Sequence, residues 1–123
     1  MGYILVIEDD PSVRLMITRR LESAGYSVRA SSNGHDGLAL ALRDPPHLLL
    51  LDVNLPDASG LEICRTVKQR LSTTAPPVIV MSARGQVADV SAAHTAGAGD
   101  YLIKPVAPGE LLVHVQRFDY LNH

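Results

Sequence analysis

The chain has 123 residues, which corresponds to about one domain and is long enough to bury a hydrophobic core. Its 46% hydrophobic residues, 20% charged residues and net charge of −2 are typical of a globular protein, and they lack the basic excess of most proteins that bind nucleic acid directly. The sequence shows no apolar run long enough for a membrane span, no signal peptide and only one cysteine, Cys64, so we expect no internal disulfide and a cytoplasmic location.

The first two predicted elements are a strand and a helix. Residues 3–7 form an apolar run that predicts a buried strand. The pair Asp10 and Pro11 is typical of a helix start, with Asp10 as the N-cap and Pro11 in the first turn. Apolar residues then recur at helical spacing, and we expect the helix to stop at Gly25.

The next segments predict two strands of different character. Residues 26–30 alternate and are less apolar, which favours an edge strand, and a second helix follows over residues 34–43. Residues 47–51 are apolar on both faces, as in a central strand of a parallel sheet. A loop then leads to a third helix, whose apolar face includes Leu61 and Cys64.

The last third of the chain repeats the alternation. Residues 77–81 predict another buried strand, and residues 87–96 predict a helix rich in small side chains. A short fifth strand is expected over residues 101–103, and a final helix is expected to begin at Pro108.

Five successive strand–helix units predict a single domain over residues 1–123 of the α/β class. Such alternation implies a doubly wound parallel sheet with helices on both faces. The flavodoxin-like strand order 2-1-3-4-5 places the two weakest strands, the second and the fifth, at the edges. In this order, the switch point lies between the first and third strands.

Acidic residues follow the two strands that flank the switch point. Glu8 and Asp9 end the first strand, and Asp52 ends the third. Ligands of doubly wound sheets bind beyond the carboxyl ends of the strands at this point, so three carboxylates should converge there. Because like charges repel, such a cluster needs protonation or a cation. A hard divalent ion with oxygen ligands, Mg²⁺, is the cofactor that we expect.

The neighbouring strand ends add a hydroxyl and a positive charge. Ser82 follows the fourth strand, and Lys104 follows the fifth. A metal and a lysine beside a carboxylate are suited to phosphoryl transfer, where catalysis is mostly positioning and charge neutralisation. An aspartate can act as the nucleophile, and Asp52 is the best candidate because its strand is the most buried. The Ser82 hydroxyl could then donate to a phosphoryl oxygen.

At this point a resemblance to a known family becomes apparent. The pieces that carry it span nearly the whole chain, in the order "ILVIEDDPSVR", "LLLLDVNLPDASGLE", "VIVMSA" and "GAGDYLIKP". In this order and spacing, the chain resembles the receiver domain of two-component response regulators. The resemblance implies a signalling domain that catalyses only its own phosphorylation and dephosphorylation. It implies a histidine kinase or phosphotransfer protein as the partner, and an output domain is possible in the full-length protein. No direct binding of nucleic acid or membrane is expected.

The resemblance also implies a role for each residue of the cluster. Asp52 accepts the phosphoryl group from a phosphohistidine of the partner. Asp9 is a direct Mg²⁺ ligand, as are Asp52 and the backbone carbonyl of Asn54, whereas Glu8 acts through water. Lys104 contacts the phosphoryl group.

A conformational switch is implied as well. By resemblance, Ser82 moves its hydroxyl to the phosphoryl group and Tyr101 turns its ring inward behind it. The surface that changes is formed by the fourth helix, the fifth strand and the fifth helix. The peptide bond between Lys104 and Pro105 is expected to be cis, mainly because of the resemblance.

Two functions of other classes remain as alternatives. "DVN", which begins at Asp52, is similar to the D-x-D loop of haloacid-dehalogenase-type phosphatases, but Asn54 cannot serve as the second acid. A flavodoxin-like FMN-binding module would share the strand order. Its first loop should be rich in Ser, Thr and Gly to bind phosphate, whereas "EDDPSV" is anionic.

Overall fold

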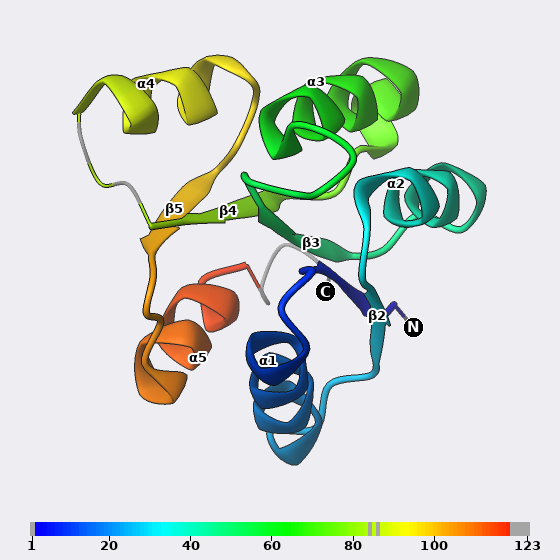
Figure 1. Ribbon diagram of the computed structural model, residues 1–123. Helices are drawn as coiled ribbons and strands as arrows, with labels where there is room; N and C mark the ends of the chain where they lie inside the picture. Colours follow the sequence, from blue (N-terminus) through cyan, green and yellow to red (C-terminus); the bar gives the residue numbers. More distant parts are fainter. Residues whose placement is uncertain (1, 84, 86, 119–123) are drawn as a thin grey trace.

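A computed structural model of the chain describes residues 2–83, 85 and 87–118 (Figure 1). Strands and helices alternate along the chain in this order: β1 (Ile4–Ile7), α1 (Pro11–Ser23), β2 (Val28–Ser31), α2 (Gly34–Arg43), β3 (Leu48–Asp52), α3 (Gly60–Leu71), a short 3-10 turn η1 (Ser72–Thr74), β4 (Val78–Ser82), α4 (Val87–Thr95), β5 (Asp100–Ile103) and α5 (Pro108–Gln116). Both ends of the domain predicted over residues 1–123 lie outside the described residues, so its limits stay a prediction.

The sheet has the predicted topology. Its five strands are parallel and follow the order β2-β1-β3-β4-β5. Every residue of β1, β3 and β4 is buried, whereas β2 is half-buried or exposed, which explains why the apolar runs occupy the centre and the weaker segments the edges. The prediction of fold class is therefore confirmed.

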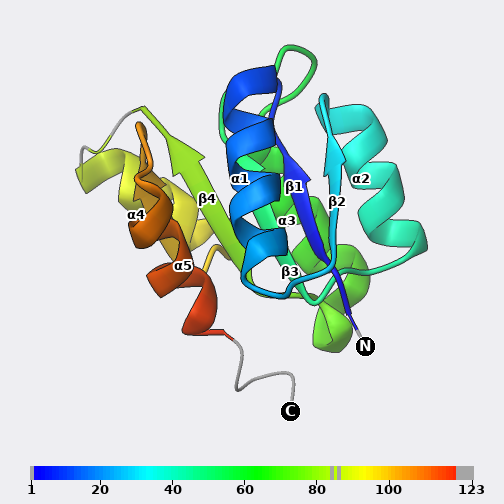
Figure 2. The same cartoon turned by 90° about the horizontal axis from the view of Figure 1, so that it is seen from below.

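Two hydrophobic cores lie on opposite faces of the sheet. Helices α1 and α5 cover one face, and α2, α3 and α4 cover the other (Figure 1). Because successive side chains of a strand point to opposite faces, Ile4 and Val6 pack with α1 and α5, whereas Leu5 and Ile7 pack with the other three helices. Figure 2 shows the same layers from below. This arrangement leaves the strand ends free to carry polar groups.

The start of α1 follows the prediction. The Asp10 side chain accepts hydrogen bonds from the backbone N–H groups of Ser12 (2.8 Å) and Val13 (3.2 Å), and Pro11 opens the helix. At 13 residues, α1 is the longest helix of the described part of the chain, and none there combines the length and hydrophobicity of a bilayer span.

Some strand boundaries differ from the predicted ones by one or two residues. β2 begins at Val28 rather than at residue 26, because the Tyr26 N–H donates to the Leu21 carbonyl at the end of α1 (3.1 Å). Gly25 makes this reversal with a φ of 97°. β3 and β4 each extend one residue further than predicted, so that Asp52 and Ser82 are the last residues of these strands.

Candidate functional site

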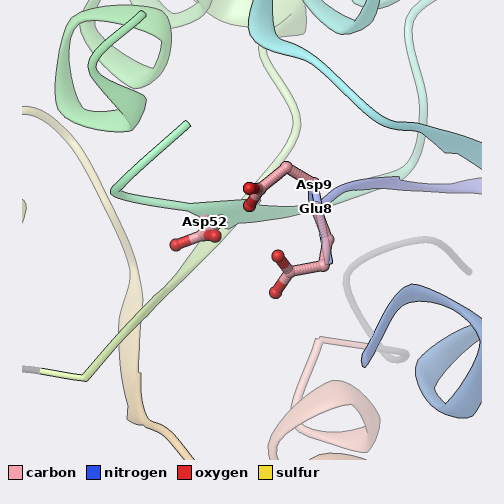
Figure 3. A group of neighbouring side chains, drawn as sticks. All are labelled: Glu8, Asp9 and Asp52. Carbon is pink, nitrogen blue, oxygen red and sulfur yellow. The ribbon is translucent and has the colours of Figure 1, made fainter. Parts of the chain in front are cut away.

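The three predicted acidic residues meet at the carboxyl end of the sheet. Ligand atoms of Glu8, Asp9 and Asp52 lie within 4.8 Å of one another (Figure 3). Glu8 and Asp9 follow β1, and Asp52 ends β3, its neighbour in the sheet. Glu8 and Asp52 are buried, whereas Asp9 is exposed. The cluster therefore has a buried floor and an open side.

Lys104 supplies the positive charge that the sequence predicts. Its Nζ lies 3.1 Å from Oδ2 of Asp52 and forms an ion pair with Oε1 of Glu8. The Lys104 N–H donates to the Ser82 carbonyl (2.8 Å), which fixes the backbone after β5 against the end of β4. The peptide bond between Lys104 and Pro105 is cis, as predicted. One cation is thus shared between two buried carboxylates.

Burial and mutual charge effects shift the pKa values of Glu8 and Lys104. Burial raises the pKa of Glu8 to about 7, and the nearby Asp52 adds to this, although Lys104 and the Asp10 N–H (3.1 Å) oppose it. Burial works to lower the pKa of Lys104, but hydrogen bonds and charges of Glu8 and Asp52 raise it above its usual value. The site therefore favours any additional positive charge.

These residues fit a divalent cation with hard oxygen ligands. Three carboxylates stand close together, and among the described residues Lys104 is the cation that forms ion pairs with two of them; Asp9 leaves one side open to water. Mg²⁺ typically takes one or two carboxylates and keeps several waters. The donor set is therefore one that this ion accepts, whereas thiols and imidazoles are not part of it.

The loop after β3 is held tightly against Asp52. The Asn54 N–H donates to Oδ1 of Asp52 (3.1 Å), and Asn54 forms an isolated antiparallel bridge with Ser59. The Gly60 N–H donates to the Val53 carbonyl (2.8 Å), which closes the loop. Asn54 therefore lies next to the acidic cluster, as predicted, and the role of its carbonyl as a ligand remains a prediction.

The predicted switch residues occupy neighbouring strands. Ser82 is buried at the end of β4, and Tyr101 lies on β5, where it pairs with Val80 and packs against the core beneath α4. Tyr101 is three residues before Lys104, so it lies further from the strand ends than the cluster does. Ser82 and Tyr101 thus lie on the neighbouring strands β4 and β5, and their roles in a switch remain a prediction.

Arg14 also supports the site, although no role was assigned to it from the sequence. Nη1 of Arg14 donates to the backbone carbonyls of Glu8 (2.9 Å) and Asp9 (3.2 Å). The arginine projects from α1 and holds the acidic segment in place from outside the cluster. Its only sequence signal is that it lies one turn into the helix that directly follows the acids.

The close approach at Gly60 gives a testable prediction. A Cβ there would lie 2.1 Å from the backbone oxygen of Asp52, whereas a Cβ at Gly109 would meet nothing within 4 Å. We expect Gly60→Ala to lower the free energy of unfolding by about 2–3 kcal/mol, because backbone atoms must shift to make room. Gly109→Ala, the matched control, should be neutral or slightly stabilising. Equal stability of both variants in urea unfolding would contradict this account.

Comparisons with known proteins identify the family. The family described as "Response regulator receiver domain" matches residues 4–116. The chain is 37% identical over 116 residues to the DNA-binding dual master transcriptional regulator RpaA of Synechocystis sp.. The aligned region covers 94% of this chain and 48% of that protein. It is 42% identical over 113 residues to the transcriptional regulatory protein HprR of Escherichia coli, with coverage of 92% and 49%. The chain thus spans about half the length of these curated relatives.

A solved structure agrees with these sequence matches. The BeF3-activated receiver domain of DrrB, a response regulator of Thermotoga maritima, superposes with a TM-score of 0.86 at 34% identity, covering 100% of this chain and 99% of that one. None of the three matches supports the phosphatase or flavin alternative. The chain belongs to the receiver domains of two-component response regulators.

Proposed function

We propose that the chain is a phosphoacceptor in a two-component phosphorelay, and that Asp52 receives the phosphoryl group in a Mg²⁺-dependent reaction. The observation that carries this proposal is the placement of Asp52: it is buried at the end of β3, hydrogen-bonded to Lys104 and beside two further carboxylates. The donor is a phosphohistidine of a histidine kinase or phosphotransfer protein.

The transfer follows from this placement. One carboxylate oxygen of Asp52 forms a bond to phosphorus while the P–N bond of the phosphohistidine breaks, and the electron pair returns to the imidazole, which takes up a proton. Lys104 balances negative charge on the phosphoryl oxygens, and Ser82 donates its hydroxyl to one of them. Asp9, Asp52 and the Asn54 carbonyl would hold Mg²⁺, with Glu8 acting through water. The bound ion would supply further charge neutralisation. The chain catalyses only its own phosphorylation and dephosphorylation.

A small phosphoryl donor tests the proposal without knowledge of the kinase. Incubation with acetyl phosphate and Mg²⁺ should raise the intact mass by one phosphoryl group, and a chelator should prevent the increase. Borohydride reduction of the acyl phosphate followed by peptide mapping should locate it at Asp52. Phosphorylation at another residue, or labelling that is independent of a divalent metal, would contradict the proposal.

Mg²⁺ should also stabilise the folded protein through the same residues. A ligand at ten times its dissociation constant stabilises by about 1.4 kcal/mol, which corresponds to a rise in Tm of about 5 °C for a domain of this size. Asp9→Ala should remove most of this rise. Asp10→Asn should keep the rise in Tm. Asp10 belongs to the same acidic segment, but its side chain caps α1. Thermal unfolding with and without Mg²⁺ measures both, and equal stabilisation of Asp9→Ala and the parent would show that the ligand set is wrong.

Phosphorylation should shift the surface formed by α4, β5 and α5. A phosphoryl group on Asp52 offers Ser82 a charged acceptor, and hydrogen bonds to charged groups contribute about 1.5–3 kcal/mol each. Such a gain can bias an existing equilibrium toward the conformation in which Tyr101 fills the space behind Ser82. Beryllofluoride should therefore change amide chemical shifts across residues 87–118. Changes confined to the loops around Asp9 and Asp52 would contradict the switch.

The relatives also suggest what accompanies this domain in the full-length protein. Two of them are named as transcriptional regulators, and the chain covers about half of each. We therefore propose that an output domain accompanies this receiver in its full-length protein, that the chain itself contacts neither nucleic acid nor membrane, and that it acts in the cytoplasm. Phosphotransfer from a panel of histidine kinases would identify the partner.

A further inference from the structure

A second carboxylate of the loop after β3 makes long-range contacts. Asp57 accepts hydrogen bonds from the N–H groups of Gly34 and His35, at Oδ1 and Oδ2 respectively, each at 2.8 Å. These residues are the first two of α2, more than 20 positions earlier in the chain. The bend of this loop lies beside the start of α2 in both views (Figures 1 and 2). Asp57 therefore links the loop after β3 to the start of α2, two segments that are far apart in the sequence.

The first turn of α2 is built to receive this carboxylate. Its own N-cap, Asn33, accepts only from the Asp36 N–H (2.8 Å), so the N–H groups of Gly34 and His35 are left for Asp57. A carboxylate at a helix N-terminus also interacts favourably with the helix dipole. The two backbone hydrogen bonds lower the pKa of Asp57, which shows that they stabilise its charged form.

Gly34 allows the loop to approach this closely. A Cβ at Gly34 would lie 3.0 Å from the Cβ of Ala58, 3.3 Å from Oδ1 of Asp57 and 2.7 Å from Cδ1 of Ile63. A larger residue would push the loop and α3 away from the helix. The contact between loop and helix is therefore a packed one and does not rest on two surface hydrogen bonds alone.

The same loop carries the candidate metal ligand. Asn54 lies three residues before Asp57, and its N–H is bound to Oδ1 of Asp52. The inner end of the loop is fixed by the Gly60 N–H to Val53 carbonyl bond (2.8 Å). Asp57 fixes the outer end. The peptide group that bears the Asn54 carbonyl lies between these two fixed points of the loop.

We propose that Asp57 is a positioning residue for the metal site: by binding the first turn of α2, it holds the loop that presents the Asn54 carbonyl to Mg²⁺. The proposal rests on the proposed function, because it assumes that Mg²⁺ binds at this site. Partners that orient metal ligands contribute about 10–100-fold in metal affinity. Asp57 acts on Asn54 through two intervening residues, Leu55 and Pro56, so we expect the lower end of this range.

Two cap variants of the same helix separate positioning from simple stability. Asp57→Ala and Asn33→Ala each remove a carboxylate or amide that caps α2, but only Asp57 belongs to the loop after β3. Both should lower Tm to a similar extent. Mg²⁺ titrations followed by amide chemical shifts should show a dissociation constant about tenfold higher for Asp57→Ala and an unchanged one for Asn33→Ala. Asp57→Asn, which keeps one acceptor oxygen, should fall between Asp57→Ala and the parent.

The outcomes distinguish this inference from the proposed function. If the parent binds Mg²⁺ at the cluster and Asp57→Ala binds it equally well, the positioning role is wrong and the proposed function stands. Equal weakening by Asn33→Ala would also overturn it, because general loosening of α2 would then be the cause. If Asp57→Ala does not fold, Asp57→Asn decides, and an unchanged affinity there overturns the proposal. If the parent shows no Mg²⁺-dependent shifts at Asp9 and Asn54, the proposed metal site itself is wrong and this inference falls with it.

Discussion

Asp52→Asn is expected to carry no phosphoryl group after incubation with acetyl phosphate and Mg²⁺, under conditions in which the parent is labelled. The amide is nearly the same size as the carboxylate, so the buried position at the end of β3 should tolerate it. The amide lacks the anionic oxygen that would attack phosphorus in the proposed reaction. It also removes one of the carboxylates that would hold Mg²⁺. Intact mass spectrometry measures the effect, which should be complete.

The control for this variant changes an acid of the neighbouring segment. Asp10 caps α1 through the N–H groups of Ser12 and Val13, and Asn is as good an N-cap as Asp. Asp10→Asn should therefore fold and accept the phosphoryl group like the parent. Labelling of Asp52→Asn at the parental level would show that another residue is the acceptor.

The free energy of unfolding of the metal-free protein is expected to fall as the pH rises from about 4.5 to about 7. The pKa of Glu8 is about 7 in the folded state, against 4.5 for an ordinary glutamate, mainly because the side chain is buried. The folded protein therefore binds this proton more tightly than the unfolded chain does. The resulting stabilisation is fully present below pH 4.5 and is lost as the pH rises through 7. Its size is on the order of 3 kcal/mol.

Glu8→Gln isolates this effect from the titration of other groups. The amide cannot ionise, so the difference in unfolding free energy between parent and variant should change with pH over this window and flatten above it. Mg²⁺ should reduce the dependence on pH in the parent, because the cation favours the ionised carboxylate. Urea unfolding at several pH values provides the measurement. A difference between parent and variant that stays constant from pH 4.5 to 8 would show that the pKa of Glu8 is the same in the folded and unfolded states.

Much of the fold could be predicted because strands that are buried on both faces appear in the sequence as continuous apolar runs. The runs that became β1, β3 and β4 are apolar at every position up to the site residues, and the order of the sheet follows from placing the weaker strands at the edges. The start of β2 was predicted two residues too early, because the Tyr26 N–H is bound to the end of α1. That hydrogen bond depends on the path of the chain after Gly25, which an alternating pattern does not encode.

Some residues of the candidate site could likewise be predicted from the sequence, and others could not. Glu8, Asp9, Asp52 and Lys104 could be brought together from the sequence, because the ends of parallel strands meet at one edge. Arg14 and Asp57 could not. Both bind backbone groups of other segments, and a backbone carbonyl or N–H is the same at every position. Only the three-dimensional path shows which of these groups are within reach.

The separation of the two cores from the strand ends has a practical consequence for protein engineering. Asn54 and Ala83, which follow β3 and β4, are exposed, so a library that randomises their side chains would leave the packing of the sheet untouched. Glu8, Asp52 and Ser82 are buried among the same strand ends, and most substitutions there would compete with the cores for space. A designer who wishes to alter the lifetime of the proposed acyl phosphate should therefore begin with the exposed positions. Variants at those sites can change the chemistry while the scaffold keeps its folding stability.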